Sequence, residues 1–148
     1  MKDLQFEEKM ILNELRKNSR ISMLEVAKKT NIPLSTVYDK VNTYERGIIK
    51  KHTAIIDFAM LGYLSRVLVI IKVKKEERLN FLNYLANHPN INTLYRTNSD
   101  SDFIFELVSN NAKETNDILE DIGDLKGFVS KSYFTLIDDI KREDFLIK

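Results

Sequence analysis

The sequence predicts an α+β protein with two parts: an N-terminal helix-turn-helix domain, winged-helix-like in type, and a ferredoxin-like βαββαβ domain. Two observations predict this fold class. In the first third of the chain, apolar residues recur at helical spacing in three short segments, with the tight connection TNIP before the third. In the remainder, strand-like and helical segments follow in the order β-α-β-β-α-β. The expected boundaries are 1–52 for the first domain, 53–64 for a linker strand and turn, and 65–148 for the second domain.

The first two helices are marked by an apolar stripe and by a helix start. Residues 3–18 place four aliphatic side chains on one helical face: Leu4, Ile11, Leu12 and Leu15. Ser22 and Glu25 form a capping box, in which each side chain can satisfy a free backbone N–H at the start of the second helix. Ile21 and Val26 occupy the accompanying hydrophobic-staple positions. The second helix is therefore expected to be short and to begin at a defined residue.

The connection to the third helix is expected to be tight. Asn31 tolerates a left-handed backbone, and Pro33 suits the first turn of a helix, where its missing N–H is not needed. In the helix that follows, Val37, Val41 and Tyr44 recur at i, i+4 and i+7. These three side chains should therefore face the first two helices.

The opposite face of the third helix is polar and fits a DNA groove. Its hydroxyl and amide groups can donate to or accept from base edges, and its two cations can meet phosphates. The candidate DNA-binding residues are Ser35, Thr36, Tyr38, Asp39, Lys40, Asn42, Thr43 and Arg46. A solvated face of an ordinary three-helix bundle has the same pattern, so periodicity alone leaves both interpretations open.

Composition and charge exclude several classes of function. The 148 residues include no cysteine, which excludes disulfides, thiolate metal sites and cysteine nucleophiles. No apolar run reaches the roughly 18 residues of a membrane span, so we expect a cytoplasmic protein without a membrane partner. Residues 1–52 hold 11 Lys and Arg against 7 Asp and Glu, a net charge of +4, whereas the remainder is net −3. A polyanion would be drawn to the N-terminal half.

The second half has the pattern of a four-stranded sheet with two helices. Val67, Val69, Ile71 and Val73 alternate along a β-branched strand, and Leu79, Leu82, Leu85 and Ala86 fit a following helical stripe. The segments INTLYRT and DFIFELVS then form a hairpin, because NSDS between them is a turn signal. A helix over 112–122 and the strand FVSKSYFTL complete the order. This arrangement leaves one sheet face open, with either Leu68 and Ile70 or Val129 and Tyr133 on it, depending on the register.

The segment RISMLEVAKKTNIPLSTVYDKVNTYERGIIKKHTAIIDFAMLGY resembles the N-terminal module of Lrp/AsnC (feast/famine) transcription regulators. The elements that carry the resemblance are Ile11, Leu12, Leu15, Arg20 to Ser22, Ala27, Ser35 to Val37, Gly47 to Ile49, Ala54, Asp57, Leu61 and Gly62. The resemblance implies a sequence-specific regulator that binds double-stranded promoter DNA. The family's effector-sensing domain has the βαββαβ topology, so the likeness extends over nearly the whole chain.

This sequence departs from the family pattern at the reading helix. Asn31 replaces the usual turn glycine and Pro33 the usual serine, and both suit their backbone roles. The helix end YERGII is one residue short, and Asp39 stands where relatives often have a basic residue. Asp39 would repel phosphate but could accept from a cytosine amino group, so we expect an unusual operator preference.

The resemblance also implies a homodimer or higher homo-oligomer and an effector site. Relatives bury the open sheet face by dimerising, and their linker, here Lys50–Asp57, pairs as a strand across the dimer. Their effector, often an amino acid, lies near a loop with a glycine and, three residues later, an aspartate. The corresponding residues are Asn98, Ser99, Asp100 and Asp102, without the glycine. Either this loop binds an effector, or Asp100 and Asp102 only form the turn.

No motif points to an enzyme, a metal site or a cofactor. His52 and His88 have no ligand-spaced neighbours, and the glycines form no phosphate-binding loop. Two alternatives remain. One is an assembly partner of a paralogue that has lost its own DNA binding, and the other is an enzyme similar to the siroheme decarboxylases, which resemble Lrp/AsnC proteins. The net negative second half argues against binding an anionic tetrapyrrole.

Overall fold

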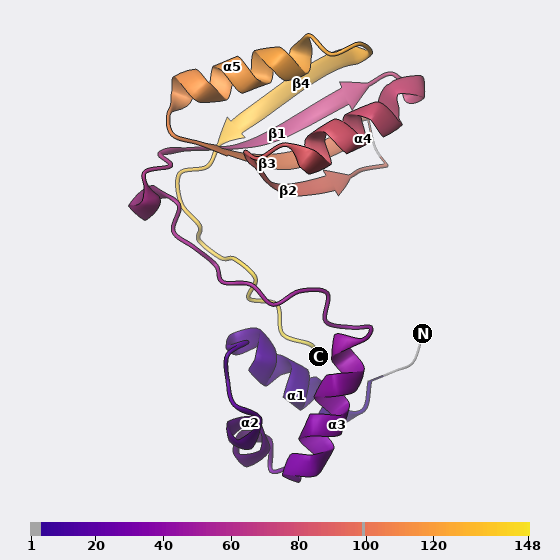
Figure 1. Cartoon of the computed structure of the whole chain (residues 1–148), viewed down its shortest axis with the longest axis vertical. Coiled ribbons are helices and arrows are strands. Elements are labelled where there is room, and N and C mark those ends of the chain that lie inside the picture. Colours follow the sequence, from indigo (N-terminus) through magenta and orange to yellow (C-terminus); the bar gives the residue numbers. More distant parts are fainter. Residues whose placement is uncertain (1–3, 99) are drawn as a thin grey trace. The chain divides into compact units, whose positions relative to one another are not determined.

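The computed structural model describes residues 4–98 and 100–148, and its contacts divide the chain into two units (Figure 1). The first unit comprises Met1–Ile55 and Ile140–Lys148, and the second is Ile56–Asp139. The chain therefore crosses from one unit to the other twice, once through the linker and once after the last strand. The last nine residues, which are expected in the second domain from the sequence, group with the first unit instead.

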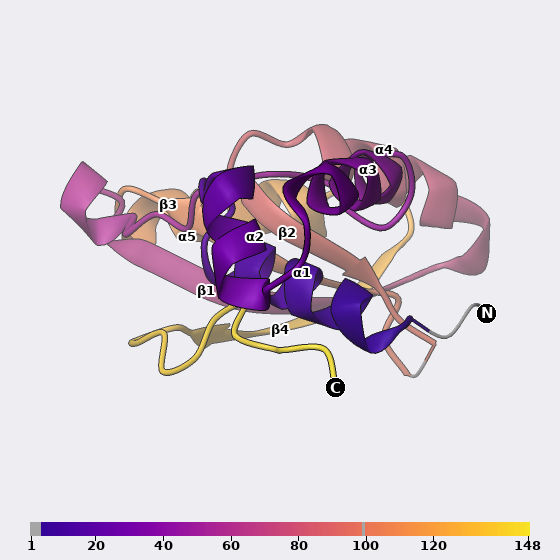
Figure 2. The same cartoon turned by 90° about the horizontal axis from the view of Figure 1, so that it is seen from below.

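The first unit is built on three helices, which are α1 (Phe6–Lys17), α2 (Met23–Thr30) and α3 (Leu34–Glu45) (Figures 1 and 2). They share a core in which the side chains predicted from periodicity are buried: Ile11, Leu12, Leu15, Val26, Val37, Val41 and Tyr44. Burial of these groups stabilises the unit by about 25 cal/mol for each Å² of apolar surface that leaves water. This burial holds the three short helices together. The helix-turn-helix prediction is confirmed at this level.

Local hydrogen bonds define where the helices begin and end. The Ser22 hydroxyl oxygen accepts from the Glu25 N–H at 3.2 Å, as the capping box requires. Asn31 ends α2 in the left-handed region, with φ 56° and ψ 34°, and Pro33 directly precedes α3. The start of α1 is capped as well, because the Gln5 N–H donates to the Glu8 carboxylate at 2.8 Å.

The C-terminal segment contacts α1. The Asn13 side chain and the Ile147 backbone exchange two hydrogen bonds of 3.0 and 2.8 Å, and the Arg16 Nε donates to the Phe145 carbonyl at 2.6 Å. The Ile147 side chain packs against the helical core. Periodicity could not reveal this docking, because the partners lie more than 120 residues apart in sequence.

The second unit is a four-stranded antiparallel sheet with two α-helices and the predicted βαββαβ order. Its strand order is β2-β3-β1-β4. The elements are β1 (Ser65–Val73), α4 (Arg78–Asn87), β2 (Ile91–Arg96), β3 (Phe103–Ser109), α5 (Ala112–Gly123) and β4 (Phe128–Thr135), with 3-10 turns at Ala59–Leu61 and Lys75–Glu77. Both helices pack on one face of the sheet, where β1 and β3 contribute Val67, Val69, Ile71, Val73, Phe103, Phe105 and Leu107.

The expected stripe on α4 is partly wrong. Leu79 is 66% exposed and Ala86 is also exposed, whereas Phe81 and Leu85 are buried and Leu82 is half-buried. The helix is therefore rotated from the predicted phase. The large Phe81 ring is buried together with Leu85 at i+4, because this phase of the helix buries more apolar surface than the phase that would bury Leu79.

The linker also differs from expectation. Residues 51–57 form no strand in the single chain, and the expected pairing of this segment as a strand across a dimer stays a prediction. The turn that follows ends at Gly62, whose φ of 91° is readily adopted only by glycine.

Candidate nucleic-acid interface

One face of α3 is exposed and polar. Because Val37, Val41 and Tyr44 are buried beneath it, the opposite side chains point away from the core. Exposed on α3 and directly after it are Ser35, Tyr38, Asp39, Asn42, Thr43 and Arg46, and Thr36 is half-buried at the margin. The structure therefore brings together most of the residues predicted to contact DNA. This surface carries hydroxyl, amide, carboxylate and guanidinium groups, which suit hydrogen bonding to base edges and phosphates.

Within this face, the side chains of Arg46 and Asn42 form no hydrogen bond or ion pair with another described residue, whereas the Thr43 side chain forms a hydrogen bond. The Thr43 hydroxyl donates to the Asp39 carbonyl at 2.9 Å, one turn earlier in the helix, and its oxygen can still accept. Among the described residues, none forms an ion pair with Arg46. Arg46 is thus a cation available to an anionic ligand.

Lys40 is different, because its charge is already paired. Its Nζ lies 2.7 Å from Oε1 of Glu8, and only a third of the Lys40 side chain is exposed. The neighbouring Tyr44 hydroxyl is buried and has no hydrogen-bond partner among the described residues. Burial, and then the negative charge of Glu8, raise the pKa of Tyr44 to about 12. Sequence reasoning missed Glu8, since it lies 32 positions from Lys40 and no local pattern links them.

The loop predicted to bind an effector is held by its own aspartate. The Asp102 side chain is buried, where its Oδ2 accepts from the Val73 N–H at 2.8 Å and its Oδ1 lies 2.6 Å from Nε of Arg78. Asp102 thus fastens the β2–β3 turn to the end of β1. Asn98 and Asp100 are exposed, and Ser99 lies outside the described residues.

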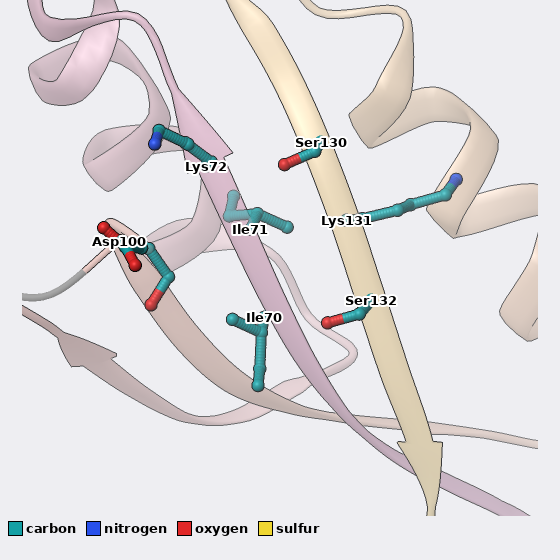
Figure 3. A pocket seen from close by; sticks show the side chains of 8 residues that line it. Ile70, Ile71, Lys72, Asp100, Ser130, Lys131 and Ser132 are labelled. Carbon is teal, nitrogen blue, oxygen red and sulfur yellow. The ribbon is translucent and has the colours of Figure 1, made fainter.

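Two hollows border this loop. The first lies over β1 and β4, with Ile70, Lys72, Asp100, Ser130 and Ser132 around it (Figure 3). Lys131 points away from this hollow, because its ammonium donates to the Leu119 carbonyl of α5 at 2.6 Å (Figure 3).

The second hollow is more polar and is lined by Arg78, Arg96, Thr97, Asn98, Ser101 and Asp102. Its two guanidinium groups could bind a carboxylate. Both hollows adjoin the same turn: the first is lined there by Asp100 and Ser101, and the second by Thr97, Asn98, Ser101 and Asp102.

The uncovered sheet face carries Leu68 and Ile70, the first of the two alternatives predicted. Their cross-strand neighbours are Glu106 and Ile104 on β3. On β4, Phe134 lies opposite Leu68 and is 59% exposed. Tyr133 pairs with the buried Val69, and since directly paired residues share a face, Tyr133 belongs to the helix-covered side.

An ion network borders this uncovered face. Arg66 lies 2.6 Å from Glu106 and 2.9 Å from Asp139. The Arg66 guanidinium donates hydrogen bonds to Asp139 and Glu106, and these bonds raise the pKa of Arg66 further above its ordinary value, so this cation stays charged. The open face therefore combines aliphatic side chains with a fixed charge cluster.

Neither a metal site nor a membrane span is found in residues 4–98 and 100–148. No three His, Cys, Asp or Glu side chains in these ranges lie together as metal ligands. In the same ranges, every helix is too short or too polar to cross a bilayer.

Known proteins are similar to this chain in sequence and in fold. Residues 8–49 match the winged helix-turn-helix DNA-binding family. The chain is 32% identical to the HTH-type transcriptional regulator FL11 of Pyrococcus horikoshii over 121 residues, which cover 81% of this chain and 80% of that protein. The Neisseria meningitidis transcriptional regulator NMB0573, solved with L-Met, has a TM-score of 0.85 at 14% identity, covering 95% of this chain and 94% of its own.

The crystal structure of LrpC from Bacillus subtilis is also similar, with a TM-score of 0.84 at 24% identity over 95% of this chain and 99% of that one. At such identity, the two solved structures support the fold alone. The extent of the match to FL11 carries the assignment of family and function. The chain belongs to the Lrp/AsnC family of DNA-binding transcriptional regulators.

Proposed function

We propose that α3 reads a major groove, with Ser35, Thr36, Asp39 and Asn42 at base edges and Arg46 at a phosphate. The observation that carries this proposal is the exposed polar face of α3 above its buried Val37, Val41 and Tyr44. A helix of this diameter fits the major groove, and its short polar side chains then lie at base edges. Tyr38 and Thr43 flank these positions and complete the contact surface.

The test begins with selection of genomic fragments by the purified protein, followed by affinity for an enriched and a scrambled duplex at several salt concentrations. Arg46→Ala should weaken binding to both duplexes and reduce the salt slope by about one unit. Asn42→Ala should alter preference at one base position and lower the affinity for the enriched site by about 1–3 kcal/mol. Lys126→Ala is the control, because it removes an exposed cation from the second unit.

Two outcomes would redirect the proposal. Unchanged binding by both Arg46→Ala and Asn42→Ala would show that α3 is not the reading helix. No DNA binding by the wild-type protein alone would favour the assembly-partner alternative. The relatives are transcriptional regulators, which supports the expectation that this chain acts without catalysis.

We propose further that the protein binds DNA as a homodimer or a higher homo-oligomer that buries the open sheet face. Leu68, Ile70 and Phe134 give this face an apolar surface, which association would remove from water. A two-fold pair would also present two α3 helices to two half-sites. Phe134→Asp should shift the protein toward monomer in sedimentation equilibrium. Leu79→Asp is the matched control, since Leu79 is as exposed but lies on α4, and a dimer that survives Phe134→Asp would refute this interface.

We propose an amino acid as the class of effector, bound beside the β2–β3 turn. Asp100 is an exposed carboxylate that could accept from an ammonium group, and Arg96 could pair with a carboxylate. The solved complex of the Neisseria relative with L-Met supports this class. Asn98 would contribute a polar contact from the same turn. Calorimetry against the twenty amino acids tests the proposal, and Asp100→Ala should abolish any binding that is found, whereas no heat with any of them would contradict it.

A further inference from the structure

We propose that Glu8 acts as an internal competitor of DNA for Lys40, and so limits the part of the affinity that does not depend on sequence. The inference rests on the proposed function, because it needs α3 to face DNA. It assigns Glu8 as a positioning residue that acts through Lys40 and does not itself contact the nucleic acid.

The two side chains of the pair differ in burial and in how firmly they are held. Glu8 is held in place, since its Oε2 accepts from the Gln5 N–H at 2.8 Å while its Oε1 lies 2.7 Å from the Lys40 ammonium. The Glu8 side chain is only 10% exposed, whereas Lys40 is 32% exposed. The carboxylate is thus a fixed anion at the start of α1, and the lysine is the partner that can leave toward solvent.

Lys40 lies at the margin of the proposed reading face. Thr36, Lys40 and Thr43 follow one another at i, i+4 and i+7, so they line one side of α3. Lys40 is the only cation within this helix, which also contains Asp39 and Glu45. Its long flexible stem would allow the ammonium to reach a phosphate beside the groove once Glu8 no longer holds it.

A carboxylate and a phosphate compete for this ammonium on similar terms. Each offers an anionic oxygen and a charge-assisted hydrogen bond, so exchanging one for the other gains little. A lysine that is neutralised internally also has less influence on the counterions that DNA releases on binding. In the wild-type protein, Lys40 should therefore contribute little to affinity or to its salt dependence.

The experiment is a double-mutant cycle with Glu8→Gln and Lys40→Gln, measured on a scrambled duplex over a series of salt concentrations. Glutamine at position 8 keeps an acceptor for the Gln5 N–H, and glutamine at position 40 can still donate to Glu8. Glu8→Gln should bind about three to ten times more tightly and steepen the salt slope by about 0.9. Lys40→Gln alone should stay within about twofold of wild type, and the double variant should lose most of the gain.

Non-additivity separates this mechanism from a general charge effect. If Glu8→Gln strengthens binding equally whether Lys40 is present or not, Glu8 acts only by repelling DNA, and the proposal is overturned. It is also overturned if Lys40→Gln alone weakens binding as much as Arg46→Gln does. That comparison needs no change at Glu8, so it holds even if the Glu8 variant fails to fold.

Arg46→Gln also separates this inference from the proposed function. If Arg46→Gln weakens binding but the cycle is additive, α3 remains the reading helix and only the role of Glu8 is refuted. If Arg46→Gln has no effect, the interface itself is wrong and the inference fails with it.

Discussion

Replacing Asp102 will show whether this carboxylate supports the fold or serves a ligand. In the structure, it accepts a hydrogen bond from the buried Val73 N–H at 2.8 Å and lies 2.6 Å from Nε of Arg78. Asp102→Ala removes both interactions at once. The Val73 N–H then stays buried without an acceptor, because β1 ends at that residue and Asp102 supplies its bond.

The two contacts should contribute unequally to the free energy of unfolding. A hydrogen bond to a charged group is worth about 1.5–3 kcal/mol, and an unsatisfied buried N–H adds to its loss. The ion pair with Arg78 is partly exposed and is worth at most about 1 kcal/mol. We therefore expect a loss of about 2–4 kcal/mol for Asp102→Ala and no more than about 1 kcal/mol for Arg78→Ala. Asp102→Asn should lie between them, because its amide oxygen can still accept from Val73.

Thermal unfolding without effector measures these differences. For a unit of this size, 1 kcal/mol corresponds to about 4–8 °C in Tm, so Asp102→Ala should lower the transition of the second unit by at least about 8 °C. The helical unit has its own core, and its transition serves as an internal reference. An Asp102→Ala protein with unchanged Tm would refute the structural role and return Asp102 to the candidate ligand-binding residues.

Two further substitutions test buried features of the fold. Tyr44→Phe removes a hydroxyl without a partner, so it should raise stability at pH 7 by up to about 1 kcal/mol in denaturant unfolding. Since burial raises the folded pKa of Tyr44 to about 12, above the ordinary 10, the free energy of unfolding does not depend on this titration below pH 10 and falls as the pH rises from 10 toward 12. Tyr44→Phe should reduce that fall, and an unchanged pH profile would contradict the assignment. Gly127→Ala should lower Tm more than Gly62→Ala does; both glycines have positive φ, but only at Gly127 would a Cβ lie 2.5 Å from Glu77. Equal losses would refute this steric argument.

Periodicity predicted most of the fold because the buried faces follow simple repeats. Val67, Val69, Ile71 and Val73 alternate without interruption, and every one of them is buried. The stripe on α4 was predicted in the wrong phase, since Leu79, Phe81, Leu82 and Leu85 allow two helical phases. Only packing against the sheet selects between them. The packing of Ile147 against the helical core could not be predicted from periodicity for another reason, because its contacts are with residues far away in the sequence.

The positions of the candidate site residues on α3 were predictable from the sequence, whereas the ion pairs and hydrogen bonds that hold its charged side chains were not. Side-chain type and helical phase were enough to place Asn42 and Arg46 on the exposed face of α3. They could not show that Lys40 is held by Glu8, or that Asp102 is bonded to the end of β1. Charged residues are expected at the surface by default, so a sequence pattern gives no sign that a particular one is half-buried against a distant partner.

The charges of α3 bear on how this regulator distinguishes its operator from other DNA. The helix contains one lysine against Asp39 and Glu45, and the lysine is neutralised by Glu8. Directly after the helix, Arg46 is then the cation that has no ion pair among the described residues. Sequence-independent affinity comes from cations at phosphates, so this surface should bind random DNA weakly. Under the proposed function, discrimination would then come from hydrogen bonds to bases, and simultaneous engagement of two helices in a dimer would supply the affinity that one weakly charged helix lacks.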